Sequence, residues 1–157
     1  MRRYRFIMLA LATIVVTACH SIDPDTDAYI DAVSSVCVEW GADKQTVSDF
    51  MEGWELKAEG RDYMDFYLPD EDYLVTYVFY DGKMESGALI VPESRPVTFS
   101  YVLKKYTYVG MTVIFNPDTD HAELYADQGR NLMLALYSEE YAGISYNILG
   151  FTPLKKQ

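Results

Sequence analysis

The side chains best suited to acid–base or metal chemistry are few in this chain. It has 2 histidines, His20 and His121. A catalytic triad or a zinc site needs several such groups at defined spacing, as in two histidines on one turn of a helix. The sequence has no such spacing, no cysteine pair and no glycine-rich phosphate loop. We therefore expect no enzyme activity and no cofactor, and we expect His121 to lie at the exposed start of a strand.

Closely spaced carboxylates offer the other chemistry, the binding of a hard cation. Asp70 and Asp72 follow one proline, and Asp118 and Asp120 follow another. Calcium takes about six to eight oxygen ligands, and each cluster offers only two or three carboxylates. We expect ordinary turns here, with weak calcium binding as the alternative. Paired carboxylates for glycoside hydrolysis give no usable signal in a chain with 24 acidic residues.

The N-terminal segment has the pattern of a secretory signal peptide. Three arginines precede an apolar run over 6–16, which is shorter than the roughly 20 residues that a spanning helix needs. The junction of Ala18 with Cys19 resembles the lipobox of bacterial lipoproteins. That resemblance implies acylation of the Cys19 sulfur, with palmitate among the acyl chains, and cleavage just before it. An ordinary signal peptide is the alternative.

The residues after Cys19 bear on location. His20 at the second position resembles lipoproteins that are sent on to the outer membrane. The acidic residues Asp23 and Asp25 resemble surface-export signals of some Gram-negative lineages. We expect a signal peptide over 1–18, a lipidated cysteine and tether over 19–26, and one domain over 27–157, held on the periplasmic or the surface face of the outer membrane. A membrane anchor of two or more acyl chains is stable where a single chain is marginal.

The charge of the chain is strongly acidic and uneven. The formal net charge is -11, and it becomes -14 when the three arginines of the signal segment are removed. Residues 20–100 hold 18 Asp and Glu against 5 Lys and Arg, whereas 101–157 hold 6 against 5. This balance argues against binding nucleic acid and against electrostatic adhesion to anionic lipid. The acidic half is either a solvated surface or a face that meets a basic partner.

Hydrophobic periodicity predicts three helices and a series of strands. Apolar residues at helical spacing predict a helix over 29–40, with Cys37 in the core, and a short second helix that Asp43 caps. A third helix is expected over 96–106. Alternating residues and turn signals predict strands over 54–59, 64–68, 73–80, 83–91, 111–115, 122–126 and 131–137, with one more within 141–151.

This order of elements indicates an internal duplication. Phe66 and Phe115 each precede a turn and then a strand that contains a tyrosine, Tyr77 in one case and Tyr125 in the other. We expect an α+β domain of two helix-plus-antiparallel-meander units, over 27–92 and 96–151, with the helices packed on one face of an antiparallel sheet.

The first unit also resembles a known family. Gly41, Val47, Met51, Trp54 and the run from Tyr77 to Lys83 resemble the helix, helix, three-strand pattern of small outer-membrane lipoproteins associated with β-barrel assembly. The same architecture in tandem is similar to that of secreted β-lactamase inhibitor proteins. The resemblance implies a β-lactamase-inhibitor-protein-like fold and a tendency to bind proteins.

The chain has 14 tyrosines, more than one small core requires. Along 73–80 both alternating faces are apolar, so this strand is either central and covered or part of an aromatic platform. Tyrosine offers apolar contact and a hydroxyl together. We predict a binding surface made of Tyr73, Tyr77, Asp70, Asp72 and Tyr125. The expected partner is an envelope or extracellular protein, and a glycan captured for a nutrient-uptake system is the alternative.

Overall fold

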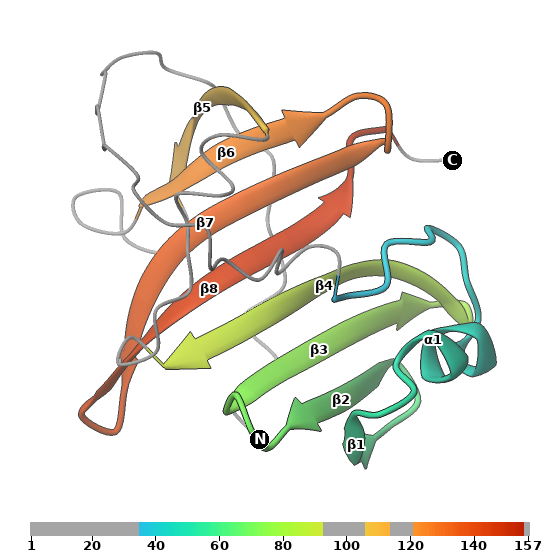
Figure 1. Ribbon diagram of the computed structural model, residues 1–157. Helices are drawn as coiled ribbons and strands as arrows, with labels where there is room; N and C mark the ends of the chain where they lie inside the picture. Colours follow the sequence, from blue (N-terminus) through green and yellow to red (C-terminus); the bar gives the residue numbers. More distant parts are fainter. Residues whose placement is uncertain (1–34, 93–105, 114–120, 156–157) are drawn as a thin grey trace.

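One antiparallel sheet of eight strands makes up most of the described chain, shown in Figure 1 as a computed structural model that describes residues 35–92, 106–113 and 121–155. A single helix, α1 (Lys44–Phe50), accompanies the sheet in these residues. The strands are β1 (Glu55–Glu59), β2 (Tyr63–Leu68), β3 (Tyr73–Tyr80), β4 (Lys83–Pro92), β5 (Thr107–Val113), β6 (His121–Asp127), β7 (Leu132–Tyr141) and β8 (Ile144–Pro153).

Each strand predicted from the sequence overlaps an observed one, and the strand expected near the C-terminus is β8. The strand expected over 111–115 begins earlier, at Thr107, and residues 114 and 115 lie outside the described residues. These segments form strands because successive side chains of a strand point to opposite faces, which suits a sequence that alternates in polarity. Along β3, for example, buried and half-buried side chains alternate. Two-residue turns close the hairpins β3–β4 and β7–β8. Asp81 and Gly82 have φ of 49° and 73°, and Ala142 and Gly143 have φ of 53° and 78°, which is the left-handed geometry that suits the twist of a hairpin.

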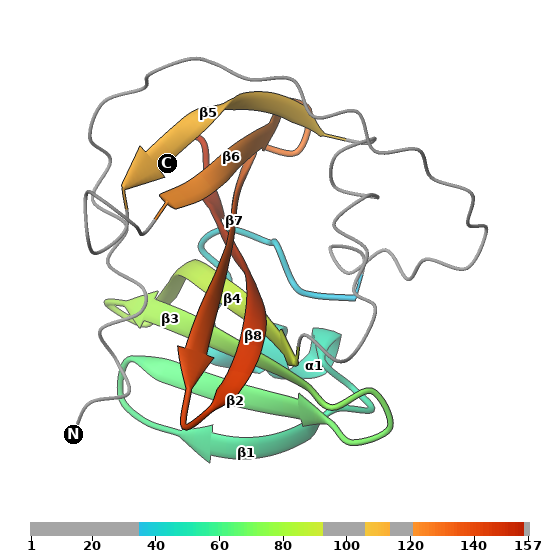
Figure 2. The same cartoon turned by 90° about the vertical axis from the view of Figure 1, so that its left-hand side faces the viewer.

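Two four-stranded meanders meet at the middle of the sheet. The strand order is β1-β2-β3-β4-β8-β7-β6-β5, so the last strands of the two meanders are neighbours. Leu89 of β4 lies opposite Leu149 of β8. The sheet is strongly twisted, with β1–β4 and β5–β6 running in different directions on either side of the β7–β8 hairpin (Figure 2), as expected when each strand turns relative to the next.

The expected α+β class, with two helix-plus-meander units and a β-lactamase-inhibitor-protein-like fold, is wrong. The described residues are almost all sheet, with one short helix. Residues 35–40, at the end of the first expected helix, form turns, a bend and irregular structure, with no helix. The rest of that helix, and residues 96–105 of the one expected over 96–106, lie outside the described residues, while Tyr106 is in a bend just before β5.

Tertiary hydrogen bonds explain why residues 35–42 are not helical. The backbone N–H of Cys37 donates to the Tyr77 hydroxyl instead of to a carbonyl one turn earlier. Gly41 N–H donates to the Met84 carbonyl, and Met84 N–H donates to the Ala42 carbonyl. The segment therefore satisfies its backbone against the sheet, and its β-branched valines have a low helix propensity in any case.

The strands that were expected to correspond in the two units do not have equivalent places in the two meanders. Tyr77 lies on β3, the third strand of its meander, whereas Tyr125 lies on β6, the second strand of the other. The turn over 69–72 corresponds by position to the turn over 128–131, since both join second and third strands and both end on a residue with positive φ, Asp72 and Asn131. Phe115 and the turn over 117–120 lie outside the described residues.

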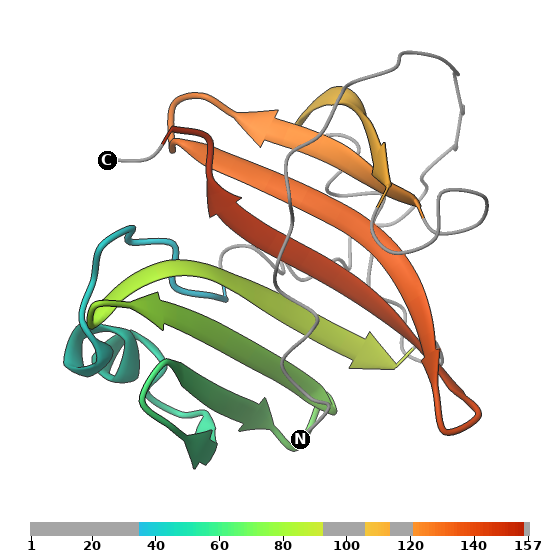
Figure 3. The same ribbon diagram turned by 180° about the vertical axis from the view of Figure 1, so that it is seen from behind.

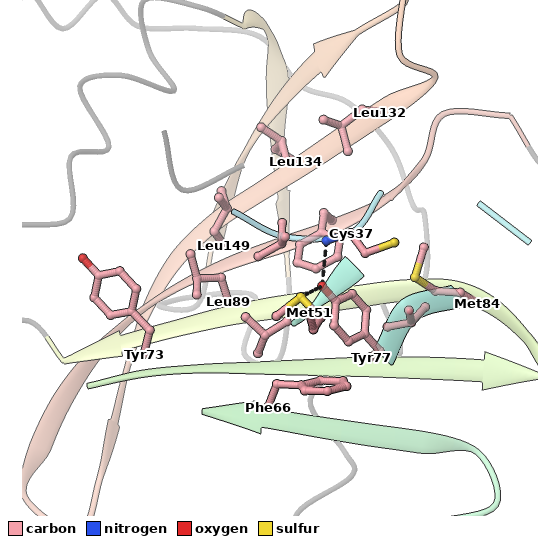
Figure 4. Packing of buried hydrophobic residues seen from close by; sticks show 14 of the residues in the cluster. Cys37, Met51, Phe66, Tyr73, Tyr77, Met84, Leu89, Leu132, Leu134 and Leu149 are labelled. Carbon is pink, nitrogen blue, oxygen red and sulfur yellow. Dashed lines mark hydrogen bonds between the residues drawn. The ribbon is translucent and has the colours of Figure 1, made fainter. Parts of the chain in front are cut away.

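The core has two parts, one on each face of the sheet. The larger one packs α1 and residues 35–42 against the face that carries Tyr77. It continues across the seam, the boundary between β4 and β8, to Leu149 (Figure 4) and to Phe151. The smaller one lies mainly on the other face of the second meander and comprises Ala88, Ala122, Leu124, Ala135, Tyr137 and Ile148. In the part of the chain that the structure describes, no helix is long and apolar enough to cross a membrane.

Candidate functional site

The three tyrosines of the predicted binding surface lie in the core. Tyr73 is 5% exposed, Tyr77 0% and Tyr125 3%. They share the sheet face that α1 and residues 35–42 help to cover. The prediction that these three form a contact surface is therefore wrong. Side chains alternate along β3 as predicted, and those of the opposite face at positions 74, 76 and 78 are half-buried.

Tyr77 is the centre of a buried hydrogen-bond network. Its hydroxyl accepts from the Cys37 backbone N–H at 2.7 Å and donates to the Met51 sulfur at 3.1 Å (Figure 4). Its ring meets Phe66 and Phe151 edge to face, at centroid distances of 6.0 and 5.9 Å. Burial strongly raises the pKa of the hydroxyl. Tyr77 thus joins the segment over 35–42, the end of α1 and the sheet, and its role is structural.

Cys37 is fully buried beside this network. Burial raises the pKa of its thiol, and a protonated thiol in apolar surroundings is a poor nucleophile. The prediction that Cys37 is a core residue is confirmed.

Tyr125 is a buried tyrosine of the second meander. Its hydroxyl donates to a Glu123 carboxylate oxygen at 2.7 Å, and its ring meets Tyr108 edge to face at 5.5 Å. Burial first, and then the Glu123 carboxylate, raise the pKa of the Tyr125 hydroxyl. Both contacts lie within or next to the β5–β6 pair, so they fix the edge of the sheet.

The acidic residues of the predicted site are on the surface, in the turn between β2 and β3. Asp70 and Asp72 are exposed, and Asp72 accepts a hydrogen bond from the Tyr67 hydroxyl at 2.8 Å. Asp118 and Asp120 lie outside the described residues. Within the described ranges no group of three or more His, Cys, Asp or Glu side chains could hold a metal ion. His121 is exposed at the start of β6, as predicted.

The other face of β2 and β3 carries a row of half-buried apolar and aromatic side chains. We call it the open face and define it as Tyr63, Tyr67, Leu74, Thr76 and Val78. Strand pairing places Tyr63 opposite Val78 and Tyr67 opposite Leu74, so these side chains are neighbours. Among the described elements the one helix packs on the opposite face and lies beside the end of β3, as Figure 3 shows from behind.

A sequence signal for this choice of face exists. Asp65 and Thr76, the polar residues in the middle of β2 and β3, lie directly opposite each other on the open face. The face with Phe66, Val75 and Tyr77 has no polar residue at the corresponding positions. Polar residues at matched places on two strands therefore mark the less buried side of this part of the sheet. Tyr63 and Tyr67 flank Asp65 on the same face of β2, so this signal could have identified them, and the prediction did not use it.

Charged side chains border the open face. The Lys57 ammonium lies 2.7 Å from a Glu55 carboxylate oxygen and 5.0 Å from the centre of the Tyr67 ring. Residues 35–92 carry 13 Asp and Glu and 4 Lys and Arg, whereas 106–113 and 121–155 together carry 4 and 2. The first meander therefore combines a partly apolar face with a strongly acidic surround.

Comparison of the chain with protein-family models, with curated proteins and with solved structures gave no match. The lipobox and the resemblance to envelope lipoproteins thus stay predictions from the sequence.

Proposed function

We propose that this chain is a lipid-anchored, non-enzymatic binding module of the outer membrane, and that its open face contacts another protein of the cell envelope. The observation that carries the proposal is the open face itself. It combines two tyrosines and two aliphatic side chains, all half-buried, on a face that no described helix covers. Apolar surface grouped in this way is typical of interaction sites.

The composition of the open face favours a protein over a sugar. Protein interfaces combine aromatic and aliphatic contact with a polar rim, and Leu74 and Val78 offer a sugar ring neither stacking nor hydrogen bonds. The acidic surround would steer a basic partner toward the face and align it. A glycan partner remains the alternative outcome of the experiment below.

The anchor is part of the proposal because the charge leaves no other attachment to the membrane surface. With three arginines removed, the remaining chain has a formal charge of -14, which anionic lipid repels. Acyl chains on Cys19 would hold the domain at the membrane despite this repulsion.

The test is capture of partners from detergent-solubilised membranes with the full lipidated chain as bait. The variant Thr76→Lys places a long cation in the middle of the open face. Thr107→Lys, which makes the same change at an exposed position of β5, is the matched control. We expect wild type and Thr107→Lys to capture the same protein and Thr76→Lys to lose it.

Equal capture by both variants would remove the open face from the proposal. Clear binding of the full chain to a glycan array, with no protein captured by the wild type, would replace the protein partner with a sugar. Thermal unfolding of both variants establishes that the loss does not come from unfolding.

A further inference from the structure

The hairpin of β7 and β8 extends beyond the strands beside it. The two strands pair from Leu132 with Pro153 to Tyr141 with Ile144. On one side β6 pairs with β7 only as far as Leu136, and on the other β4 pairs with β8 only as far as Tyr146. Residues 138–145 therefore form a two-stranded projection, here called the arm, which reaches past the described sheet at the lower left of Figure 1.

The tip of the arm is apolar and exposed. Tyr141 is 66% exposed and Ile144 is 51% exposed, and the turn residues between them, Ala142 and Gly143, are exposed as well. These two large side chains are among the most exposed apolar groups of the described chain. Within the described residues, the pairing of β4 and β6 with this hairpin stops before the tip.

The turn residue Ala142 is a second sign that the tip is specialised. It has φ of 53°, a left-handed conformation that Gly, Asn and Asp accept more readily than alanine. The corresponding turn of the first meander has Asp81 at this place, with φ of 49°. Alanine thus keeps the tip apolar where a more favourable turn residue would make it polar, and such backbone strain favours a functional interpretation of the tip.

We infer that the tip of the arm, Tyr141 to Ile144, inserts into an apolar pocket with a basic rim on the protein partner. The inference rests on the proposed function and adds a second contact to the open face. Charge complementarity identifies the occupant, because Glu140 is an exposed carboxylate next to the tip and no Lys or Arg lies within 138–145. An anionic bilayer would repel this carboxylate and the acidic chain that carries it, whereas basic side chains around a protein pocket would attract the carboxylate.

The experiment places a photo-crosslinking amino acid at position 141 of the full chain in the membranes of cells that produce it. The control places it at position 50, since Phe50 is 45% exposed on α1, which packs on the face opposite the open face. We expect position 141 to crosslink to one protein, at an apolar segment with adjacent Lys or Arg, and position 50 to give none. Ile144→Ser should lower the yield at position 141 about tenfold, the effect of losing one anchor residue.

Ala142→Asn separates binding from folding. It should raise the thermal unfolding temperature by relieving the turn, and it should lower the crosslinking yield at position 141 by making the tip polar. Crosslinks to lipid, or equal yields at positions 50 and 141, would overturn the role of the tip. If Thr76→Lys abolishes capture while position 141 gives no crosslink, the inference about the tip is wrong and the proposed function stands.

Discussion

At the scale of single residues, tyrosine has two different uses in this chain. Tyr77 is a core residue whose hydroxyl satisfies a buried backbone N–H, whereas Tyr67 lies on the open face and donates to the exposed Asp72. Both residues lie on strands of similar composition, and along each strand the side chains alternate between the two faces of the sheet. Composition alone therefore indicates many tyrosines near a surface but does not separate the structural ones from those that a partner could contact.

Removing the Tyr77 hydroxyl should destabilise the fold. In Tyr77→Phe the Cys37 N–H loses its acceptor in a buried place, and an unsatisfied buried donor costs about 1–3 kcal/mol. Urea unfolding followed by tryptophan fluorescence measures the free energy of unfolding. Tyr80→Phe, at a position that is 71% exposed, is the control and should change it by less than about 0.5 kcal/mol. Equal stability of Tyr77→Phe and wild type would contradict the importance of this bond.

The buried tyrosines also predict the response to alkaline pH. Burial, with a further contribution from Glu139, raises the pKa of the Tyr137 hydroxyl to about 12, whereas an unfolded tyrosine ionises near about 10. Between these values the folded chain keeps a proton that the unfolded chain has lost, so the free energy of unfolding falls as pH rises through this window. Thermal unfolding followed by circular dichroism should show this decline, and Tyr137→Phe should make it shallower. A decline of the same steepness in both proteins would exclude Tyr137 as a source.

At the scale of elements, the strands were predictable and the covering segments were not. Alternating residues and the Asp81-Gly82 turn identify β1 to β4 closely, and Asp43 caps α1 as expected, accepting from the Thr46 N–H at 2.9 Å. Residues 35–40 have helical spacing of apolar side chains, but their conformation depends on tertiary bonds to Tyr77 and to the start of β4. Such bonds join residues far apart in sequence, so local periodicity cannot reveal them. The choice of the open face depended on which side this segment covers.

At the seam between the meanders, an alanine in place of Gly87 should destabilise the fold, whereas an alanine in place of Gly150 should be tolerated. A Cβ on Gly87 would lie 2.4 Å from the Phe151 ring, whereas a Cβ on Gly150 would lie 3.7 Å from Ala135. Displacing the Phe151 ring disturbs its packing on Tyr77, so Gly87→Ala should lower the free energy of unfolding by about 1–3 kcal/mol. Gly150→Ala is the matched control on the partner strand. Urea unfolding that gave the same loss for both variants would contradict this description of the seam.

At the scale of the whole molecule, the chain is divided into two unlike meanders. The first carries most of the acidic residues and the open face, and the second carries the arm. If both surfaces contact one partner, they do so from opposite halves of a single continuous sheet. The sheet then acts as the rigid scaffold that fixes the distance between the two contacts.

The proposed lipid anchor on Cys19 gives a prediction for the full chain. Cys19→Ser should move the protein from the membrane fraction to the soluble fraction and abolish incorporation of labelled palmitate, because the acidic domain has no electrostatic attraction to anionic lipid. Cys37→Ser provides the control for the palmitate readout, since Cys37 is buried. Retention of Cys19→Ser at the membrane after a high-salt wash would contradict an anchor made of lipid alone.

The most direct test of the central claim compares side-chain labelling of tyrosines in intact membranes with labelling of the isolated full chain. Tyr63 and Tyr67 are half-buried on the open face, while Tyr73 and Tyr77 are buried and serve as internal controls. We predict that Tyr63 and Tyr67 are labelled in the isolated protein and protected in membranes, where the partner is present, and that Tyr77 is unlabelled in both. Equal labelling of Tyr63 and Tyr67 in the two preparations would contradict the open face as the site of contact.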